Sequence, residues 1–122
     1  MSTLKVTNIK KTGETASRDV SGVAAAWVNF NGTGTIAVRD SVNVASLSDN
    51  GTGDYNVNLS NNMTNSNYCL VLGHRGNRPA DGDGGLSGYS ASTYEVGSRS
   101  GNISSSKQDS DRMHSAVHGD LA

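Results

Sequence analysis

AWVNFNGTGTIAVRDSVNVASLSDNGTGDY, residues 26–55, holds the strongest strand patterns of the chain together with the turns that close them. The tetrapeptide Asn-Gly-Thr-Gly occurs in it twice, at residues 31–34 and 50–53, each time after a run rich in β-branched or aromatic residues. Asn-Gly tolerates positive φ at both central positions of a tight turn. Each copy therefore predicts a reversal of the chain between antiparallel strands.

The segment between the two tetrapeptides has a period of two. Its apolar residues alternate with small or polar ones, which places one set on a single face of a strand: Ile36, Val38, Val42 and Val44. Asp40 interrupts this apolar face. We therefore expect a bulge or a strand end close to Asp40.

The residues before the first tetrapeptide alternate in the same way. The better core face of residues 23–30 consists of Ala24, Ala26, Val28 and Phe30. Trp27 falls on the opposite face, where it is either covered by a second sheet or a neighbouring subunit, or exposed to a ligand such as a sugar ring. We favour packing.

Further strands are expected along the rest of the chain. Residues 54–59 form a clean half-buried pattern, and residues 68–72 are nearly all apolar, as in a central strand buried on both faces. The lone cysteine, Cys69, lies in that run, so we expect a buried thiol. Residues 90–100 and 107–118 can also form strands, the latter ending in an apolar edge. Six to eight strands at these intervals predict an antiparallel β-sandwich, jelly-roll-like in kind.

Composition limits how such a domain can be stable. The chain has 122 residues, enough for one domain, and Leu, Ile, Val and Phe together make only 22 of them. A net charge of −1 is too small for the high-charge type of disorder. Burying more surface between subunits reconciles a thin core with folding. Composition thus favours an oligomer.

Charge and hydropathy exclude several classes of function. Lys and Arg are scattered singly, which argues against nucleic acid as a partner. No apolar run approaches the roughly 20 residues of a membrane helix, so we expect no membrane insertion. Residues 1–5 lack the pattern of a signal peptide, which implies synthesis in a cytoplasm.

The decisive stretch also resembles a known module. The runs AWVNFNGTG at 26–34, VRDS at 38–41, DNGTGDY at 49–55 and the closing HGDLA at 118–122 are similar to a module of bacteriophage tail-fibre and other small virion proteins. The resemblance covers about residues 24–63 and the last few residues. It implies a trimeric, β-rich fibre tip or virion appendage with no enzymatic activity attached to these motifs.

These patterns divide the chain into two parts. Residues 1–22 hold a short alternating piece, residues 4–9, and a polar tail, and we interpret them as an attachment or linker segment that pairs with a neighbour or docks on another virion protein. Residues 23–122 form the β-sandwich domain. The expected location of the protein is the virion.

A long glycine-rich loop offers the best candidate for a binding surface. Residues 74–88, HRGNRPADGDGGLSG, have no apolar period, and loops of this length are usually functional or mobile. Arginine grips carboxylates or phosphates, aspartate accepts from paired hydroxyls, and a tyrosine ring lies against a sugar face. The predicted receptor-binding residues are Arg75, Arg78, Asp81, Asp83 and Tyr89, with host surface polysaccharide or protein as the partner. A purely disordered excursion is the equal alternative.

Metal and cofactor sites are not expected. His114 and His118 are four apart, which on a strand is roughly 13 Å, so one ion could bind both only if a site were assembled across subunits. Residues 81–85, DGDGG, alternate acids as calcium loops do, but Ser92 stands where the twelfth-position acid should be. We expect solvent or interface histidines and a solvated turn, with no cofactor.

Three functional hypotheses follow. The first is a non-enzymatic virion protein, a trimeric tail-fibre tip or short fibre whose loops face a host receptor. The second is an architectural virion protein, such as a decoration, head-fibre or adaptor protein, without receptor contact. The third and weakest is a small hydrolase acting on surface polysaccharide, because no nucleophile elbow and no placed pair of acids single out a catalytic site.

Overall fold

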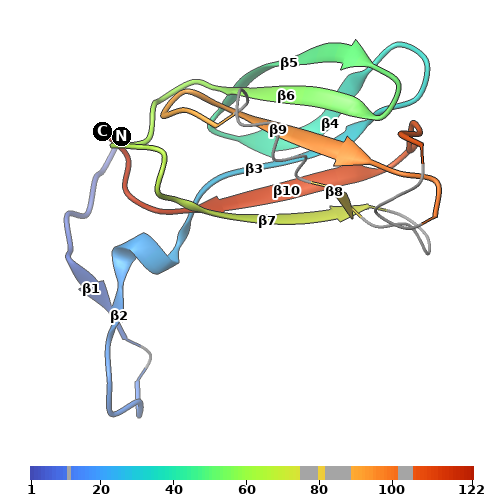
Figure 1. Ribbon diagram of the computed structural model, residues 1–122. Helices are drawn as coiled ribbons and strands as arrows, with labels where there is room; N and C mark the ends of the chain where they lie inside the picture. The colour runs from blue at the N-terminus through green and yellow to red at the C-terminus, as the bar shows by residue number, and fades with distance from the viewer. Residues whose placement is uncertain (11, 75–79, 82–88, 102–105) are drawn as a thin grey trace.

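The computed structural model describes residues 1–10, 12–74, 80–81, 89–101 and 106–122. In these residues the fold is all-β, apart from one short 3-10 turn, and it contains two four-stranded antiparallel sheets and a two-stranded ribbon. Figure 1 shows the two larger sheets as two layers, with both chain ends at the same end of the molecule. The predicted all-β class is confirmed.

The first large sheet holds the strand that opens the domain and the strand that closes it. These two strands, β3 and β10, pair antiparallel at the centre of the sheet, and β4 and β7 flank them. The order across the sheet is β4 (Ala37–Val42), β3 (Ala24–Asn31), β10 (Met113–His118) and β7 (Cys69–His74).

The second large sheet is built around the second predicted hairpin. β5 and β6 are the arms of that hairpin, and β9 pairs with the other edge of β6. The order across the sheet is β5 (Val44–Gly51), β6 (Asp54–Leu59), β9 (Thr93–Ser98) and β8 (Ala80–Asp81).

The core lies between the two sheets and follows the predicted alternation. On β6 every second side chain is buried, as expected, and on β3 the buried set is the predicted face. Phe30 of β3 meets Tyr55 of β6 edge to face, with ring centroids 5.3 Å apart. The core residues are Ala26, Val28, Phe30, Tyr55, Val57, Leu59, Met63, Tyr94, Val96, Met113 and Val117.

Both tetrapeptides reverse the chain. In the first, positive φ falls on Gly34, while Asn31 stabilises the loop by accepting from the Thr33 amide at 3.2 Å and the Thr33 hydroxyl at 2.7 Å. In the second, positive φ falls on Gly51, the glycine of the Asn-Gly pair, and on Gly53. The reversals are therefore confirmed, but in neither copy do both residues of Asn-Gly have positive φ.

Residues 36–44 are not one strand. Asn43 has a φ of 57° and separates β4 from β5, so the chain passes there from one sheet to the other. The left-handed conformation is tolerated by asparagine better than by most residues. The irregularity expected near Asp40 is confirmed, because the β3–β4 register shifts there between Asn29 and Phe30.

The expected central position of residues 68–72 is wrong. β7 is an edge strand of the first sheet, and on it Cys69 and Val71 are exposed while Leu70 and Leu72 are half-buried. The strand expected within residues 107–118 is β10, which occupies the centre of the sheet beside β3. An apolar run does not reveal which strands lie on either side of it, and pairing decides the burial of Cys69.

The N-terminal segment stands apart from the two sheets (Figure 1). It contains β1 (Asn8–Ile9) paired antiparallel with β2 (Arg18–Asp19), followed by the 3-10 turn η1 (Val20–Gly22). The strand expected over residues 4–9 is thus only two residues long. Leu4, Val6 and Ile9 are exposed, with Leu4 84% accessible. The division at residue 22 stays a prediction.

Candidate functional site

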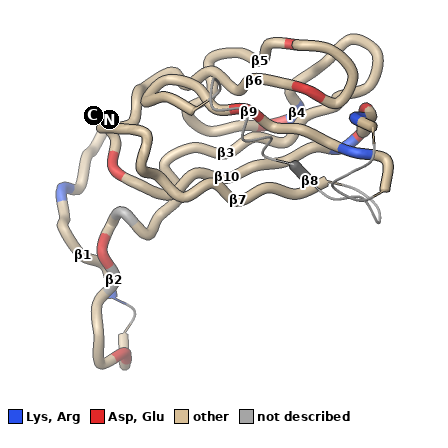
Figure 2. Tube along the Cα trace, viewed as in Figure 1, with Lys and Arg blue, Asp and Glu red and all other residues tan. Residues whose placement is uncertain are grey.

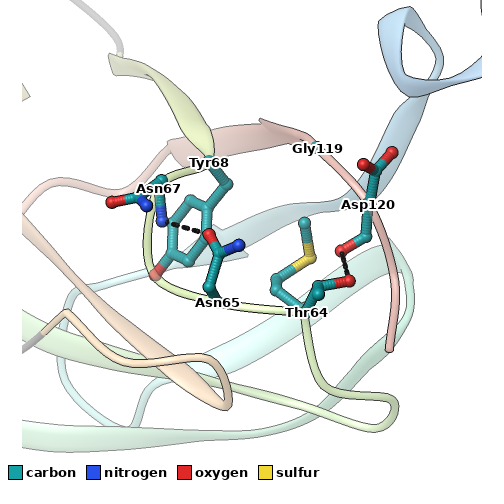
Figure 3. Close-up of a pocket in the computed structure, with 7 residues that line it drawn as sticks. Thr64, Asn65, Asn67, Tyr68, Gly119 and Asp120 are labelled. Carbon is teal, nitrogen blue, oxygen red and sulfur yellow. Dashed lines mark hydrogen bonds between the residues drawn. The ribbon is translucent and has the colours of Figure 1, made fainter.

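A pocket lies at the end of the molecule where both termini are found. One wall is the connection between β6 and β7, and the other is the chain just after β10. The pocket has a volume of about 280 Å³. Figure 3 shows its lining residues, which are Met63, Thr64, Asn65, Asn67, Tyr68, Gly119 and Asp120.

Backbone hydrogen bonds hold the two walls together. The amide of Thr64 donates to the carbonyl oxygen of Asp120 at 2.9 Å, and the amide of Ala122 donates to that of Asn62 at 2.9 Å. Met63 and Leu121 form an antiparallel bridge between these bonds. The C-terminal residues therefore fasten the β6–β7 connection, and the pocket does not depend on side chains alone for its shape.

Gly119 sets how closely the walls approach. A Cβ atom at this position would lie 3.0 Å from the Cε atom of Met63 and 3.0 Å from the Cβ atom of Tyr68. The first is a flexible side-chain end, but the second is fixed by its backbone. Any side chain at residue 119 would therefore push the walls apart or enter the pocket.

Tyr68 is a rigid wall of the pocket. Its hydroxyl lies 3.1 Å from the carbonyl oxygen of Ser90 and 3.3 Å from that of Thr93. Its ring stacks on Tyr89, with centroids 5.7 Å apart, and meets Tyr94 edge to face at 6.3 Å. Burial, with smaller contributions from Tyr89 and Tyr94, raises the pKa of Tyr68 to about 12. The phenol is therefore neutral at physiological pH.

The pocket also contains polar groups that are not used by the fold. The Oδ1 atom of Asn65 accepts from the amide of Asn67 at 2.8 Å and fixes the loop (Figure 3). Within the described part of the chain, the Asn65 Nδ2, the Asn67 side-chain amide and the Asp120 carboxylate form no hydrogen bond. Among the residues that the structure describes, no Lys or Arg lines the pocket, so Asp120 gives this lining a negative charge.

Most of the predicted receptor-binding residues cannot be placed. Arg75, Arg78 and Asp83 lie outside the described residues, and of Asp81 only the backbone is described, paired with Gly97 in β8–β9. Tyr89 is 38% exposed and lies against Tyr68. Of the five predicted residues, the structure therefore places only Tyr89, next to the pocket.

Sequence reasoning missed the other pocket residues. No function was predicted for residues 60–67, and Asp120 was considered only as part of the closing HGDLA motif. The pocket exists because β10 returns the chain end to the β6–β7 connection, which is a tertiary effect. The concentration of asparagine before Tyr68 was the available signal.

A second candidate surface is apolar and lies on the outer face of the first sheet. Trp27 pairs with Val42 on β4 and with Ala116 on β10, and Ala116 pairs with Val71 on β7. These residues form a row across all four strands, which we call the outer row: Val42, Trp27, Ala116 and Val71. Val42 is 47% and Val71 53% exposed, while Trp27 and Ala116 are half-buried.

The two histidines of β10 lie on this same outer face. The ring of His114 covers Gly73 so closely that a Cβ atom there would collide with it. The Nδ1 atom of His118 lies 3.1 Å from the carbonyl oxygen of Gly22. Within the described ranges, no three His, Cys, Asp or Glu side chains gather closely enough to hold a metal ion.

Charged residues gather at the end of the molecule away from the termini. Lys107 forms an ion pair with Asp54 at 2.6 Å and lies 3.7 Å from Glu95. Figure 2 shows Lys and Arg at this end and on the N-terminal segment, with no continuous basic stripe along the described trace. As far as the structure describes the chain, no helix is both long and apolar enough to cross a membrane.

Comparisons of the chain with protein-family models, with curated proteins and with solved structures find no match.

Proposed function

We propose that the protein is a non-enzymatic structural protein of a bacteriophage virion, a trimeric tail-fibre tip or short fibre that takes part in attachment to the host receptor. The motif resemblance at residues 26–55 and 118–122 is the reason for naming a virion. On this proposal the two sheets form a jelly-roll-like sandwich. Eight strands in two four-stranded sheets, with the first and last strand adjacent, are compatible with that arrangement.

The outer row is the single observation that best supports an assembly. It places the only tryptophan of the chain, half-buried, on the outer face of a sheet, in one row with two valines that are about half exposed. Contiguous apolar surface of this kind marks protein interaction sites, in which aromatic residues are enriched. On this proposal the subunit contacts involve β3 and β7, which carry Trp27 and Val71.

A second copy is the proposed occupant of this face. The outer row itself contains no charged residue, so it has no charge that would select a charged partner, and the thin core leaves stability to be gained from association. Cyclic symmetry joins copies through one repeated contact, which closes at three in a trimer.

The alternative is an architectural virion protein without receptor contact. It is favoured by the N-terminal segment, whose apolar residues Leu4, Val6 and Ile9 are exposed on a ribbon that stands away from the sheets. Exposed apolar side chains on an extended arm suit docking on another protein.

Labelling of purified particles tests both versions. Antibodies against the protein should decorate the tail tips of the phage that encodes it, seen by electron microscopy, and the isolated protein should bind host cells. Label on the head, with binding to virion proteins but not to cells, would favour the architectural version. Particles that bind no antibody would contradict a virion protein of either kind.

A further inference from the structure

We propose that the pocket formed by Met63, Thr64, Asn65, Asn67, Tyr68, Gly119 and Asp120 binds one neutral sugar residue of a host glycan. This inference rests on the proposed function in one respect only, namely that the glycan belongs to the host. The binding chemistry itself depends on the pocket alone.

The free polar groups of the pocket match the hydroxyls of a sugar. A carboxylate such as that of Asp120 can accept hydrogen bonds from two neighbouring hydroxyls, while the amide groups of Asn65 and Asn67 can donate to ring or hydroxyl oxygens. These groups have no partner in the described chain, so a ligand would not compete with internal hydrogen bonds. In Figure 3 the Asn65 side chain lies beside the Tyr68 ring, and the side chains of Asn67 and Asp120 lie at opposite sides of the pocket.

One wall supplies apolar surface of the right kind. Tyr68 offers a ring that is already fixed by Tyr89, Tyr94 and two backbone carbonyl oxygens, whereas Met63 is only 2% exposed and belongs to the core. A rigid ring reduces the entropy lost on binding. A sugar ring has both apolar C–H groups and hydroxyls, so it can use this wall and the polar groups together.

The size and charge of the pocket restrict the class of ligand further. About 280 Å³ is near the lower limit of ligand pockets, roughly 300 Å³, and fits a single ring better than a chain segment. Asp120 is the only charged residue among the described residues of the lining, so an acidic sugar would bring two negative charges together. We therefore expect neutral sugars to bind and uronic acids to be rejected. This differs from the predicted loop site, in which arginines would select acidic glycans.

Ligand-observed NMR tests the inference with defined probes. N-acetylglucosamine and galactose should show saturation transfer from the protein, and the backbone amide signals of Asn65, Asn67 and Asp120 should shift as either sugar is added. Glucuronate at the same concentration should show neither effect. Equal binding of glucuronate would overturn the proposed selectivity, and no transfer to either neutral sugar would overturn the site.

Matched variants locate the site. Asn67→Ala and Asp120→Asn should each weaken binding of the neutral sugar at least about tenfold, which is about 1.4 kcal/mol. Two controls alter exposed residues of the same types elsewhere, Asn50→Ala and Asp40→Asn, and should leave binding unchanged. Thermal unfolding of every variant separates loss of the site from loss of the fold. Unchanged binding in a folded Asp120→Asn variant would overturn the assignment.

Failure of the pocket inference can be distinguished from failure of the proposed function. A protein that is found on virions and binds host cells, yet binds neither neutral sugar, would overturn only the pocket inference. A protein that binds neutral sugars through Asp120 but is absent from virions would overturn only the proposed function.

Discussion

The hydroxyl oxygen of Tyr55 lies 2.5 Å from the carbonyl oxygen of Gly32, and a Cβ atom at Gly32 would lie only 2.7 Å from that hydroxyl. Tyr55 belongs to β6 of the second sheet, while Gly32 follows β3 of the first. The hydrogen bond thus joins the two sheets at the first hairpin. Gly32 has no positive φ, so what it contributes to the loop is the absence of a side chain.

Gly32→Ala should therefore destabilise the protein by about 1–3 kcal/mol, because the added methyl group forces Tyr55 out of its position. Gly22→Ala is the control, since a Cβ atom at Gly22 meets nothing within 4 Å. Urea unfolding followed by tryptophan fluorescence measures the free energy of unfolding of both variants. Equal stability of the two variants would show that the Tyr55 contact does not constrain residue 32.

Substitution of Asn43 should also destabilise the protein, for a different reason. Its Oδ1 accepts from the Asn61 backbone amide at 2.7 Å, its Nδ2 donates to the Asn61 carbonyl oxygen at 3.0 Å, and its φ is 57°. Asn43→Ala loses the hydrogen bonds and strains the backbone, which should cost about 2–4 kcal/mol, whereas Asn43→Gly relieves the strain and should cost less. Thermal unfolding compares them. A glycine variant no more stable than the alanine variant would contradict the strain argument.

The tyrosines predict the response of the protein to alkali. Burial raises the pKa of Tyr55, Tyr68, Tyr89 and Tyr94 above 10.0, that of Tyr68 to about 12. A pKa that is higher in the folded than in the unfolded state stabilises the fold fully below pH 10, and this contribution is lost as pH rises through about 12. Absorbance near 295 nm should thus show little phenolate at pH 10, with tyrosine ionisation and unfolding together at higher pH. Normal titration of all four tyrosines around pH 10 in the folded protein would contradict the prediction that burial raises their pKa values.

Features that depend on the local sequence could be predicted, whereas features that depend on tertiary contacts could not. The alternation in β3 and β6 is local, because it reflects which face of a strand meets the core, and it correctly identified Val28, Phe30, Tyr55 and Val57 as buried. The break at Asn43 could not be seen, because the alternation continues across it and the cause is a hydrogen-bonded contact with Asn61, 18 residues away.

The edge position of β7 and the pocket have the same kind of cause. Whether Cys69 is buried depends on whether another strand or sheet covers it, and β10 pairs on one side of β7 only. The pocket depends on the return of Gly119 and Asp120 to Tyr68. Tyr89 was predicted as a binding residue because an aromatic ring in a polar segment suits a sugar. Its stacking on Tyr68 could not be predicted from the sequence.

Cys69 provides a probe of the outer face. It lies two residues from Val71 on the same face of β7 and is exposed in the single chain. In an assembled trimer its reaction with a thiol reagent should be at least about tenfold slower than in a chain kept monomeric by Val71→Lys, because access controls the reaction. Equal rates would show that the outer face is not covered, and slow reaction in the monomeric variant would contradict the placement of β7.

The mass of the protein in solution tests the central claim, assembly through the outer row, most directly. Light scattering at micromolar concentration should give about three times the 12.6 kDa chain mass for the wild type. Val71→Lys should give a folded monomer, while Val38→Lys, which alters a valine 44% exposed and paired with Phe30 rather than in the outer row, should remain trimeric. A wild-type mass of one chain, or a trimer unaffected by Val71→Lys, would contradict the account.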